Sequence, residues 1–129
     1  METNDRKARV LIVDDDPALC RLLKFGLDRA GYETLTAADG AQAMALLGPQ
    51  RVDLIIVDLM MPVIDGLRFL RWLRQEAKLD VPALAFTSYD KNNAPGQALT
   101  LGATEVAVKP VKLPQLLETV TRLLGRGKG

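Results

Sequence analysis

Carboxylate, hydroxyl and ammonium side chains follow four of the short apolar runs in this sequence. They are Asp14-Asp15-Asp16, Asp58, Thr87-Ser88 and Lys109. Carboxylates that crowd together repel one another and raise each other's pKa. A divalent cation relieves that repulsion, and oxygen ligands suit Mg²⁺ or Mn²⁺. If the four runs end close together in space, these residues predict a metal site.

The same residue types suit phosphoryl transfer. A carboxylate can act as the nucleophile, and the transfer needs little beyond positioning and charge neutralisation. A metal ion and Lys109 would neutralise phosphoryl oxygens, and Thr87 would donate a hydrogen bond to one of them. None of this chemistry requires histidine.

Histidine is absent from the chain, and Cys20 is the single cysteine. The sequence therefore excludes Ser-His-Asp triads, histidine metal sites and a phosphohistidine on this chain. It also excludes an internal disulfide and a cysteine zinc site. Cys20 falls in a helical apolar pattern, and we expect it to be a small core residue.

Five apolar runs alternate with five helical patterns. Strands are expected over Arg9–Val13, Glu33–Ala37, Asp53–Asp58, Val81–Thr87 and Glu105–Lys109. Helices are expected over Pro17–Ala30, Ala41–Leu47, from Asp65 to about Gln75, for about two turns before Gly102, and over Leu113–Leu124. This alternation predicts an α/β fold with a five-stranded parallel sheet and helices on both faces. The carboxyl ends of its strands would bring the polar residues together.

The chain has 129 residues, 48% of them hydrophobic, and a net charge of +1. Its length predicts one domain over residues 8–124, with flexible ends at 1–7 and 125–129. The balanced charge argues against direct nucleic-acid binding, and no apolar run is long enough to span a membrane. Without an apolar signal segment at the start, we expect a cytoplasmic protein.

From Ala8 to Leu124 the chain resembles the receiver domains of two-component response regulators. The resemblance rests on Leu11–Pro17, on Asp53–Gly66, and on Thr87-Ser88, Gly102-Ala103 and Lys109-Pro110 in the same order. It implies a doubly wound, flavodoxin-like sheet with strand order 2-1-3-4-5. It also implies a phosphohistidine donor on a sensor kinase or phosphotransfer protein, and an output domain or target that the sequence does not identify.

The resemblance also implies a role for each site residue. Asp58 corresponds to the phosphoacceptor. Asp15, Asp58 and the backbone carbonyl of Met60 correspond to the metal ligands, with Asp14 acting through water. Thr87 and Lys109 correspond to the residues that contact the phosphoryl oxygens.

Some positions depart from the family pattern. Val106 stands where the family usually has Tyr or Phe, and its short, stiff side chain cannot make the usual inward swing. We therefore expect the conformational signal to pass through residues 87–101, with Tyr89 covering the phosphoryl group. The segment Asn92–Gly96 is expected to delay the start of the fourth helix, and Pro95 and Gly96 are expected to weaken it.

Two other classes of protein stay open at this point. A phosphatase of the haloacid dehalogenase type also begins with a strand and an Asp-x-Asp pair, here Asp14 and Asp16, although Asp16 before Pro17 could simply cap a helix. A receiver-like interaction module would keep the fold without the chemistry.

At 100° per residue, Trp72 falls outside the face of Phe69 and its apolar neighbours. It is expected either to lie over arginine stems or to contact a partner, such as a kinase or a second copy of the chain.

Overall fold

The computed structural model describes residues 7–61, 64–88 and 94–126. Its elements in chain order are β1 (Arg9–Val13), α1 (Pro17–Arg29), β2 (Glu33–Ala37), α2 (Gly40–Leu47), β3 (Leu54–Asp58), α3 (Gly66–Arg71), the π-helix η1 (Trp72–Glu76), β4 (Ala83–Thr87), α4 (Ala94–Leu101), β5 (Glu105–Val108) and α5 (Leu113–Arg126). The expected alternation is confirmed, with small differences at the ends of elements. Tyr89 and the two chain ends, 1–6 and 127–129, lie outside the described residues.

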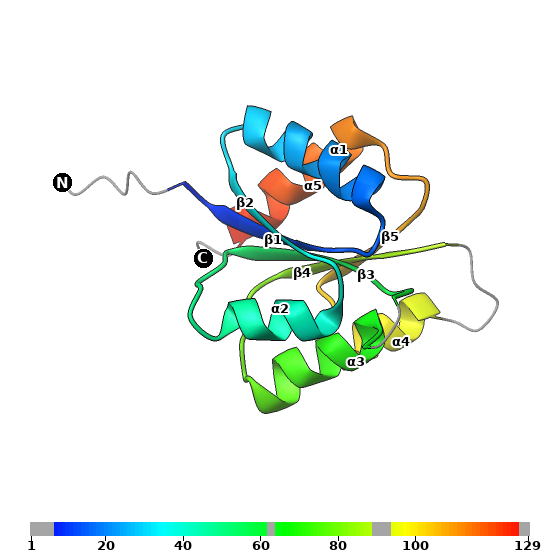
Figure 1. Ribbon diagram of the computed structural model, residues 1–129. Helices are drawn as coiled ribbons and strands as arrows, with labels where there is room; N and C mark the ends of the chain where they lie inside the picture. Colours follow the sequence, from blue (N-terminus) through cyan, green and yellow to red (C-terminus); the bar gives the residue numbers. More distant parts are fainter. Residues whose placement is uncertain (1–6, 62–63, 89–93, 127–129) are drawn as a thin grey trace.

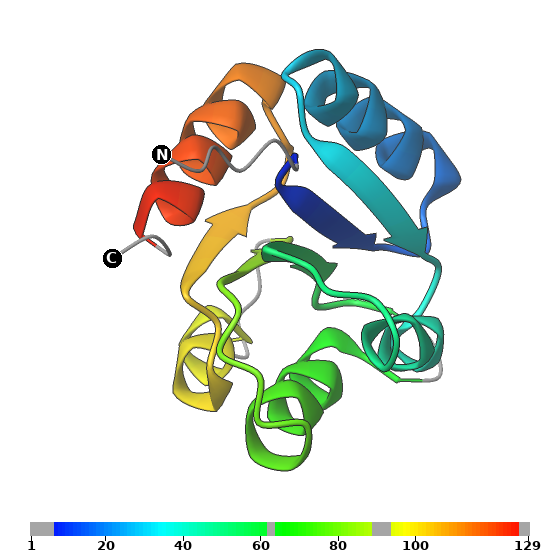
Figure 2. The ribbon, with the colours of Figure 1, turned by 90° about the vertical axis from the view of Figure 1, so that its left-hand side faces the viewer.

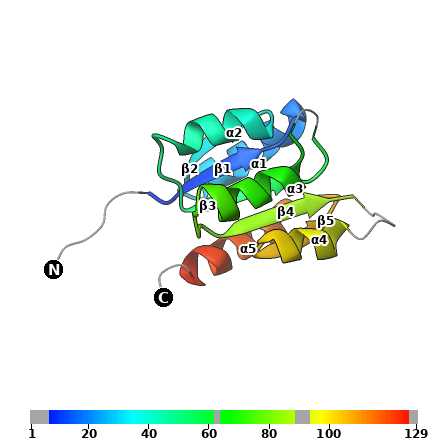
Figure 3. The ribbon, with the colours of Figure 1, turned by 90° about the horizontal axis from the view of Figure 1, so that it is seen from below.

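The five strands form one parallel sheet in the order β2-β1-β3-β4-β5, which confirms the doubly wound fold (Figure 1). All strands point the same way, as the arrows of β1 and β4 show in Figure 3. β3 lies at the centre and is buried at every position. A strand covered on both faces needs apolar side chains on both, which explains its unbroken apolar run.

Alternate residues of each strand face opposite helical layers. On one face, Val10 and Ile12 pack with buried residues of α1 and α5. On the other, Leu11 and Val13 pack with residues of α2, α3 and α4. Figure 2 shows this arrangement end on, with α1 and α5 on one side of the sheet and the other helices opposite. Among the described residues, no helix is long and apolar enough to cross a membrane.

The third helix ends in a π-helical segment, which the sequence did not indicate. After α3 the chain continues as η1, in which Ala77 donates its N–H to the carbonyl of Trp72 (2.9 Å). Trp72 is half-buried, packs against the core and stacks on Phe69, with ring centroids 6.0 Å apart. The prediction that Trp72 falls outside the face of Phe69 is therefore wrong, because residues three apart on a helix are neighbours. The contact of Trp72 with a partner stays a prediction, since part of its side chain is exposed.

The chain leaves η1 through Lys78, whose φ of 55° lies in the left-handed region. Leu79 then donates its N–H to the carbonyl of Leu73 (3.0 Å), six residues earlier, and this bond closes the wide end of the helix. A side chain with a Cβ is strained in this conformation, and glycine is not.

Lys78→Gly should raise the free energy of unfolding by roughly 0.5–1 kcal/mol, measured by urea titration. Lys78→Ala removes the same charge but keeps the Cβ, so it should not stabilise the protein. Equal stabilisation by both variants would assign the effect to charge.

The fourth helix begins at Ala94, so Pro95 and Gly96 lie inside its first turn. The helix starts within the segment 92–96 that was expected to delay it, and Pro95 and Gly96 belong to the helix because proline is tolerated in the first turn, where its missing N–H has no intrahelical partner. The expected length of about two turns is confirmed. Ala98 is the fully buried residue of this helix within the described part of the chain.

Candidate functional site

The sheet brings the polar residues of the four strand ends to one edge. Asp14 directly follows β1, Asp58 ends β3, Thr87 ends β4 and Lys109 directly follows β5. The four strands are neighbours in the sheet, and β4 pairs with β5 up to Thr87 and Val108. The main chain adds a further tie, since Lys109 donates its N–H to the carbonyl of Thr87 (2.8 Å).

Three of these polar side chains are withdrawn from solvent. Asp14, Asp58 and Thr87 are the buried polar residues within the described part of the chain, and each is less than a tenth exposed. Asp15 is exposed beside them. Uncompensated burial of two carboxylates is costly, so their positions indicate a site that could hold a cation.

The carboxylates of Asp14, Asp15 and Asp58 each offer an oxygen, and these oxygens lie within 4.8 Å of one another. Burial raises the pKa of Asp14 from 3.8 to about 6; the backbone N–H of Asp16 opposes this rise, and the nearby charge of Asp58 adds to it. A group of acidic oxygens under mutual repulsion is the donor set that Mg²⁺ or Mn²⁺ accepts. The residues present therefore fit the metal expected from the sequence.

Lys109 lies across this cluster. Its Nζ is 3.2 Å from Oδ2 of Asp58 and 3.9 Å from Oδ2 of Asp14. The pair with Asp58 is the closer one, and at this distance it is a charge-assisted hydrogen bond. The one ammonium group is shared by two buried carboxylates, so it offsets only part of their charge.

The main chain holds the two buried carboxylates in place. Oδ1 of Asp14 accepts the N–H of Asp16 (2.9 Å), and Oδ1 of Asp58 accepts the N–H of Met60 (3.0 Å). The chain after Asp58 also turns back against Gly66. A Cβ on Gly66 would lie 2.6 Å from the carbonyl oxygen of Asp58, which no side chain permits. Gly66 carries no reactive group, and only its place at the end of the Asp53–Gly66 motif marks it in the sequence.

Thr87 lies at the same edge, but its hydroxyl donates to the carbonyl of Ser88 (3.0 Å). Met60 lies in the loop after β3 with its backbone N–H on Asp58, and its side chain is exposed. The structure thus brings Asp14, Asp15, Asp58, Thr87 and Lys109 to one edge of the sheet, with the Thr87 hydroxyl turned to the main chain.

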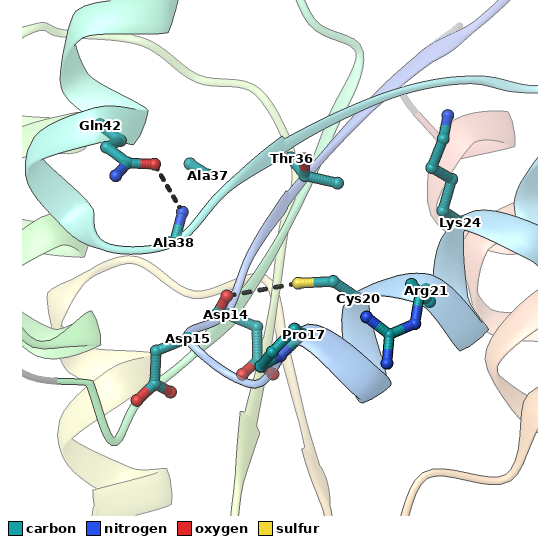
Figure 4. Close-up of a pocket in the computed structure, with 10 residues that line it drawn as sticks. All are labelled: Asp14, Asp15, Pro17, Cys20, Arg21, Lys24, Thr36, Ala37, Ala38 and Gln42. Atoms are coloured by element: carbon teal, nitrogen blue, oxygen red, sulfur yellow. Dashed lines mark hydrogen bonds between the residues drawn. The ribbon is translucent and has the colours of Figure 1, made fainter.

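A pocket of about 390 Å³ adjoins the acidic cluster (Figure 4). The thiol of Cys20 lines it and donates to the carbonyl of Asp14 (3.3 Å). Burial, followed by the charge of Asp14, raises the pKa of this thiol to about 11. Cys20 therefore stays protonated at neutral pH and is a poor nucleophile. Its packing against the core on the α1 side agrees with the structural role expected from the sequence.

The carboxylate of Asp16 binds the start of α1 and does not belong to the acidic cluster of Asp14, Asp15 and Asp58. It caps α1 by accepting the N–H of Ala18 (3.0 Å) and, more weakly, that of Leu19 (3.4 Å). An Asp-x-Asp phosphatase site would require Asp16 to face the substrate together with Asp14. The helix cap accounts for Asp16 and removes the support for that alternative.

Known proteins share this sequence pattern and this fold. Residues 10–121 match the family model of the response regulator receiver domain. The alkaline phosphatase synthesis transcriptional regulatory protein PhoP of Bacillus subtilis is 34% identical over 93% of this chain and 50% of its own length. The DNA-binding dual master transcriptional regulator RpaA of Synechocystis is 36% identical over 92% of this chain and 49% of its own. The chain thus spans about half the length of these curated relatives.

Solved structures agree. Chemotaxis protein CheY4 of Vibrio cholerae superposes with a TM-score of 0.84 at 36% identity, covering 91% of this chain and 98% of that one. The receiver domain of Francisella response regulator 1452 gives a TM-score of 0.86 at 28% identity, covering 93% and 98%. With its sheet order, its acidic strand ends and its match to the family model over most of its length, the chain belongs to the response-regulator receiver-domain family.

Proposed function

We propose that Asp58 accepts a phosphoryl group from a phosphohistidine on a sensor kinase or phosphotransfer protein. The observation that carries this proposal is the group of three carboxylates within 4.8 Å, with Lys109 Nζ 3.2 Å from Asp58. A carboxylate oxygen of Asp58 attacks phosphorus, the P–N bond to the donor imidazole breaks, and the imidazole keeps the electron pair and takes up a proton. The product is an acyl phosphate on Asp58.

Asp15, Asp58 and the carbonyl of Met60 would hold Mg²⁺ or Mn²⁺, and Asp14 would act through water. The ion would supply charge neutralisation for the phosphoryl oxygens. Lys109 neutralises a further oxygen from its present place beside Asp58. Thr87 donates to the phosphoryl group after its hydroxyl leaves the carbonyl of Ser88. Each of these residues already lies at the edge where the donor would approach.

The reacting domain comprises residues 8–124 in this proposal, and the protein works in the cytoplasm. It has no turnover of a separate substrate, since it promotes its own phosphorylation and a slow loss of the phosphoryl group. Its partners are the donor protein and an output domain or target, with no direct contact to nucleic acid or membrane. A homodimer is compatible with this role.

Intact-mass spectra test the proposal directly. Incubation with acetyl phosphate and Mg²⁺ should add one phosphoryl group to the protein, and chelation of the ion by EDTA should prevent most of it. A protein that stays unlabelled under both conditions would be an interaction module with the receiver fold. That result would overturn the proposal.

The metal ligands make a separate prediction about stability. An ion that binds only the folded state, at a free concentration of ten times its Kd, adds about 1.4 kcal/mol to the free energy of unfolding, which corresponds to roughly 4–7 °C in Tm. Millimolar Mg²⁺ should therefore raise the Tm of the wild type, and Asp15→Ala should remove most of that rise. Asp80→Ala, a change at the opposite edge of the sheet, should keep it. An equal rise in Asp15→Ala would place the ion elsewhere.

A further inference from the structure

The two adjacent methionines after β3 differ sharply in exposure. Met60 is 62% exposed, whereas Met61 is 8% exposed and packs in the core. Met44, the other methionine of the described residues, also packs against the core. Leu59 and Met61 are both buried, so the chain is anchored on each side and the Met60 side chain is held towards solvent.

Met60 is also tied to the phosphoacceptor. Its backbone nitrogen lies 3.0 Å from Oδ1 of Asp58. Adding one N–Cα bond of about 1.46 Å places the Met60 Cα within about 4.5 Å of that oxygen. The exposed side chain of Met60 therefore starts from a Cα close to the acceptor oxygen, at the edge of the sheet where a phosphodonor would approach.

We propose that Met60 is a site of reversible oxidation by peroxide, and that its oxidation slows phosphoryl transfer to Asp58. The second part rests on the proposed function. The sulfur lone pair attacks a peroxide oxygen, the O–O bond breaks, an S–O bond forms and water leaves. Sulfur is oxidised and the peroxide is reduced, and methionine sulfoxide reductases reverse the change.

The effect follows from charge at the rim. A sulfoxide oxygen carries partial negative charge, whereas the thioether is apolar. The phosphodonor is an anion, so a negative group beside its path opposes its approach. The fold should not change, because an exposed thioether contributes little to core packing. Oxidation of buried Met61 would have the opposite profile, since it would place a polar group in the core.

Peptide mapping after mild peroxide treatment tests the site itself. Met60 should gain one oxygen well before Met61, while the thermal melt stays unchanged. A thiol reductant added afterwards reverses oxidation of Cys20 to a sulfenic acid or disulfide but leaves the sulfoxide. Equal oxidation of Met60 and Met61 in the folded protein would overturn the assignment.

Labelling by acetyl phosphate, with each protein compared with its own untreated sample, tests the effect. Peroxide should slow the labelling of the wild type and of Met61→Leu by roughly two- to fivefold, and should leave the rate of Met60→Leu where it was. Met60→Gln, which carries a polar carbonyl at the same place, should not respond to peroxide either. An unchanged rate in oxidised wild type, or an equal fall in Met60→Leu, would overturn the inference. If untreated wild type takes no label, the proposed function fails, and the effect assigned to Met60 fails with it.

Discussion

Asp58→Asn should take up no phosphoryl group from acetyl phosphate, whereas Asp80→Asn should label at the wild-type rate. The amide nearly matches the carboxylate in size, and its oxygen can still accept the N–H of Met60, so the loop after β3 keeps its support. A neutral amide, however, is a far weaker nucleophile and a poorer metal ligand than a carboxylate. The loss should therefore be complete within the sensitivity of an intact-mass measurement.

Asp80 makes a matched control because it precedes β4, at the edge of the sheet opposite to the end of β3, and is exposed. Its change to asparagine removes the same charge without touching the cluster. Label on Asp58→Asn would need peptide mapping. Label at Asp14 or Asp15 would show that a neighbouring carboxylate replaces the nucleophile, and unchanged total labelling would reject Asp58 as the acceptor.

Asp14→Asn should stabilise the metal-free protein at pH 8 by up to about 3 kcal/mol. Burial raises the pKa of Asp14 from 3.8 to about 6, so folding favours its neutral form. Below pH 3.8 the group is protonated in both the folded and unfolded states and costs nothing. As the pH rises from 3.8 to 6 the unfolded state loses its proton first, and stability falls. Above pH 6 the whole cost is present, and asparagine avoids it because it carries no charge.

Urea titrations in EDTA at pH 5 and pH 8 measure this effect as a difference between two proteins. The gain from Asp14→Asn should be clearly larger at pH 8 than at pH 5, while Asp80→Asn should follow the wild type at both. Mg²⁺ competes with the proton on Asp14, so its stabilising effect on the wild type should also be smaller at pH 5. A gain from Asp14→Asn that is the same at both pH values would show that Asp14 is already charged at pH 5.

Local patterns in the sequence were sufficient for the framework of the site. The unbroken apolar run at 54–57 predicts a strand covered on both faces, and the alternation of strands with helices predicts a parallel sheet. In such a sheet the carboxyl ends of neighbouring strands lie together, so the order of residues alone places Asp14, Asp58, Thr87 and Lys109 at one edge. These properties depend on periodicity and chain order, which a single sequence displays.

Tertiary contacts decided how each side chain lies within that framework. Asp14 and Asp15 are adjacent and chemically identical, yet one is buried beside Lys109 and the other is exposed. Met60 and Met61 are also adjacent, and Met60 is exposed whereas Met61 is buried. A sequence cannot separate such neighbours, because the direction of each side chain after a strand depends on what packs against the loop.

The same reason accounts for the wrong predictions. A regular 100° rotation took no account of the stacking of Trp72 on Phe69, and propensity alone left Pro95 outside α4, although it lies in the first turn. The direction of the Thr87 hydroxyl and the close approach of Gly66 to the Asp58 carbonyl depend on atoms far apart in the sequence. Residue types and spacing determined which groups could react, and packing across the sheet decided which of them are buried, paired or open to solvent.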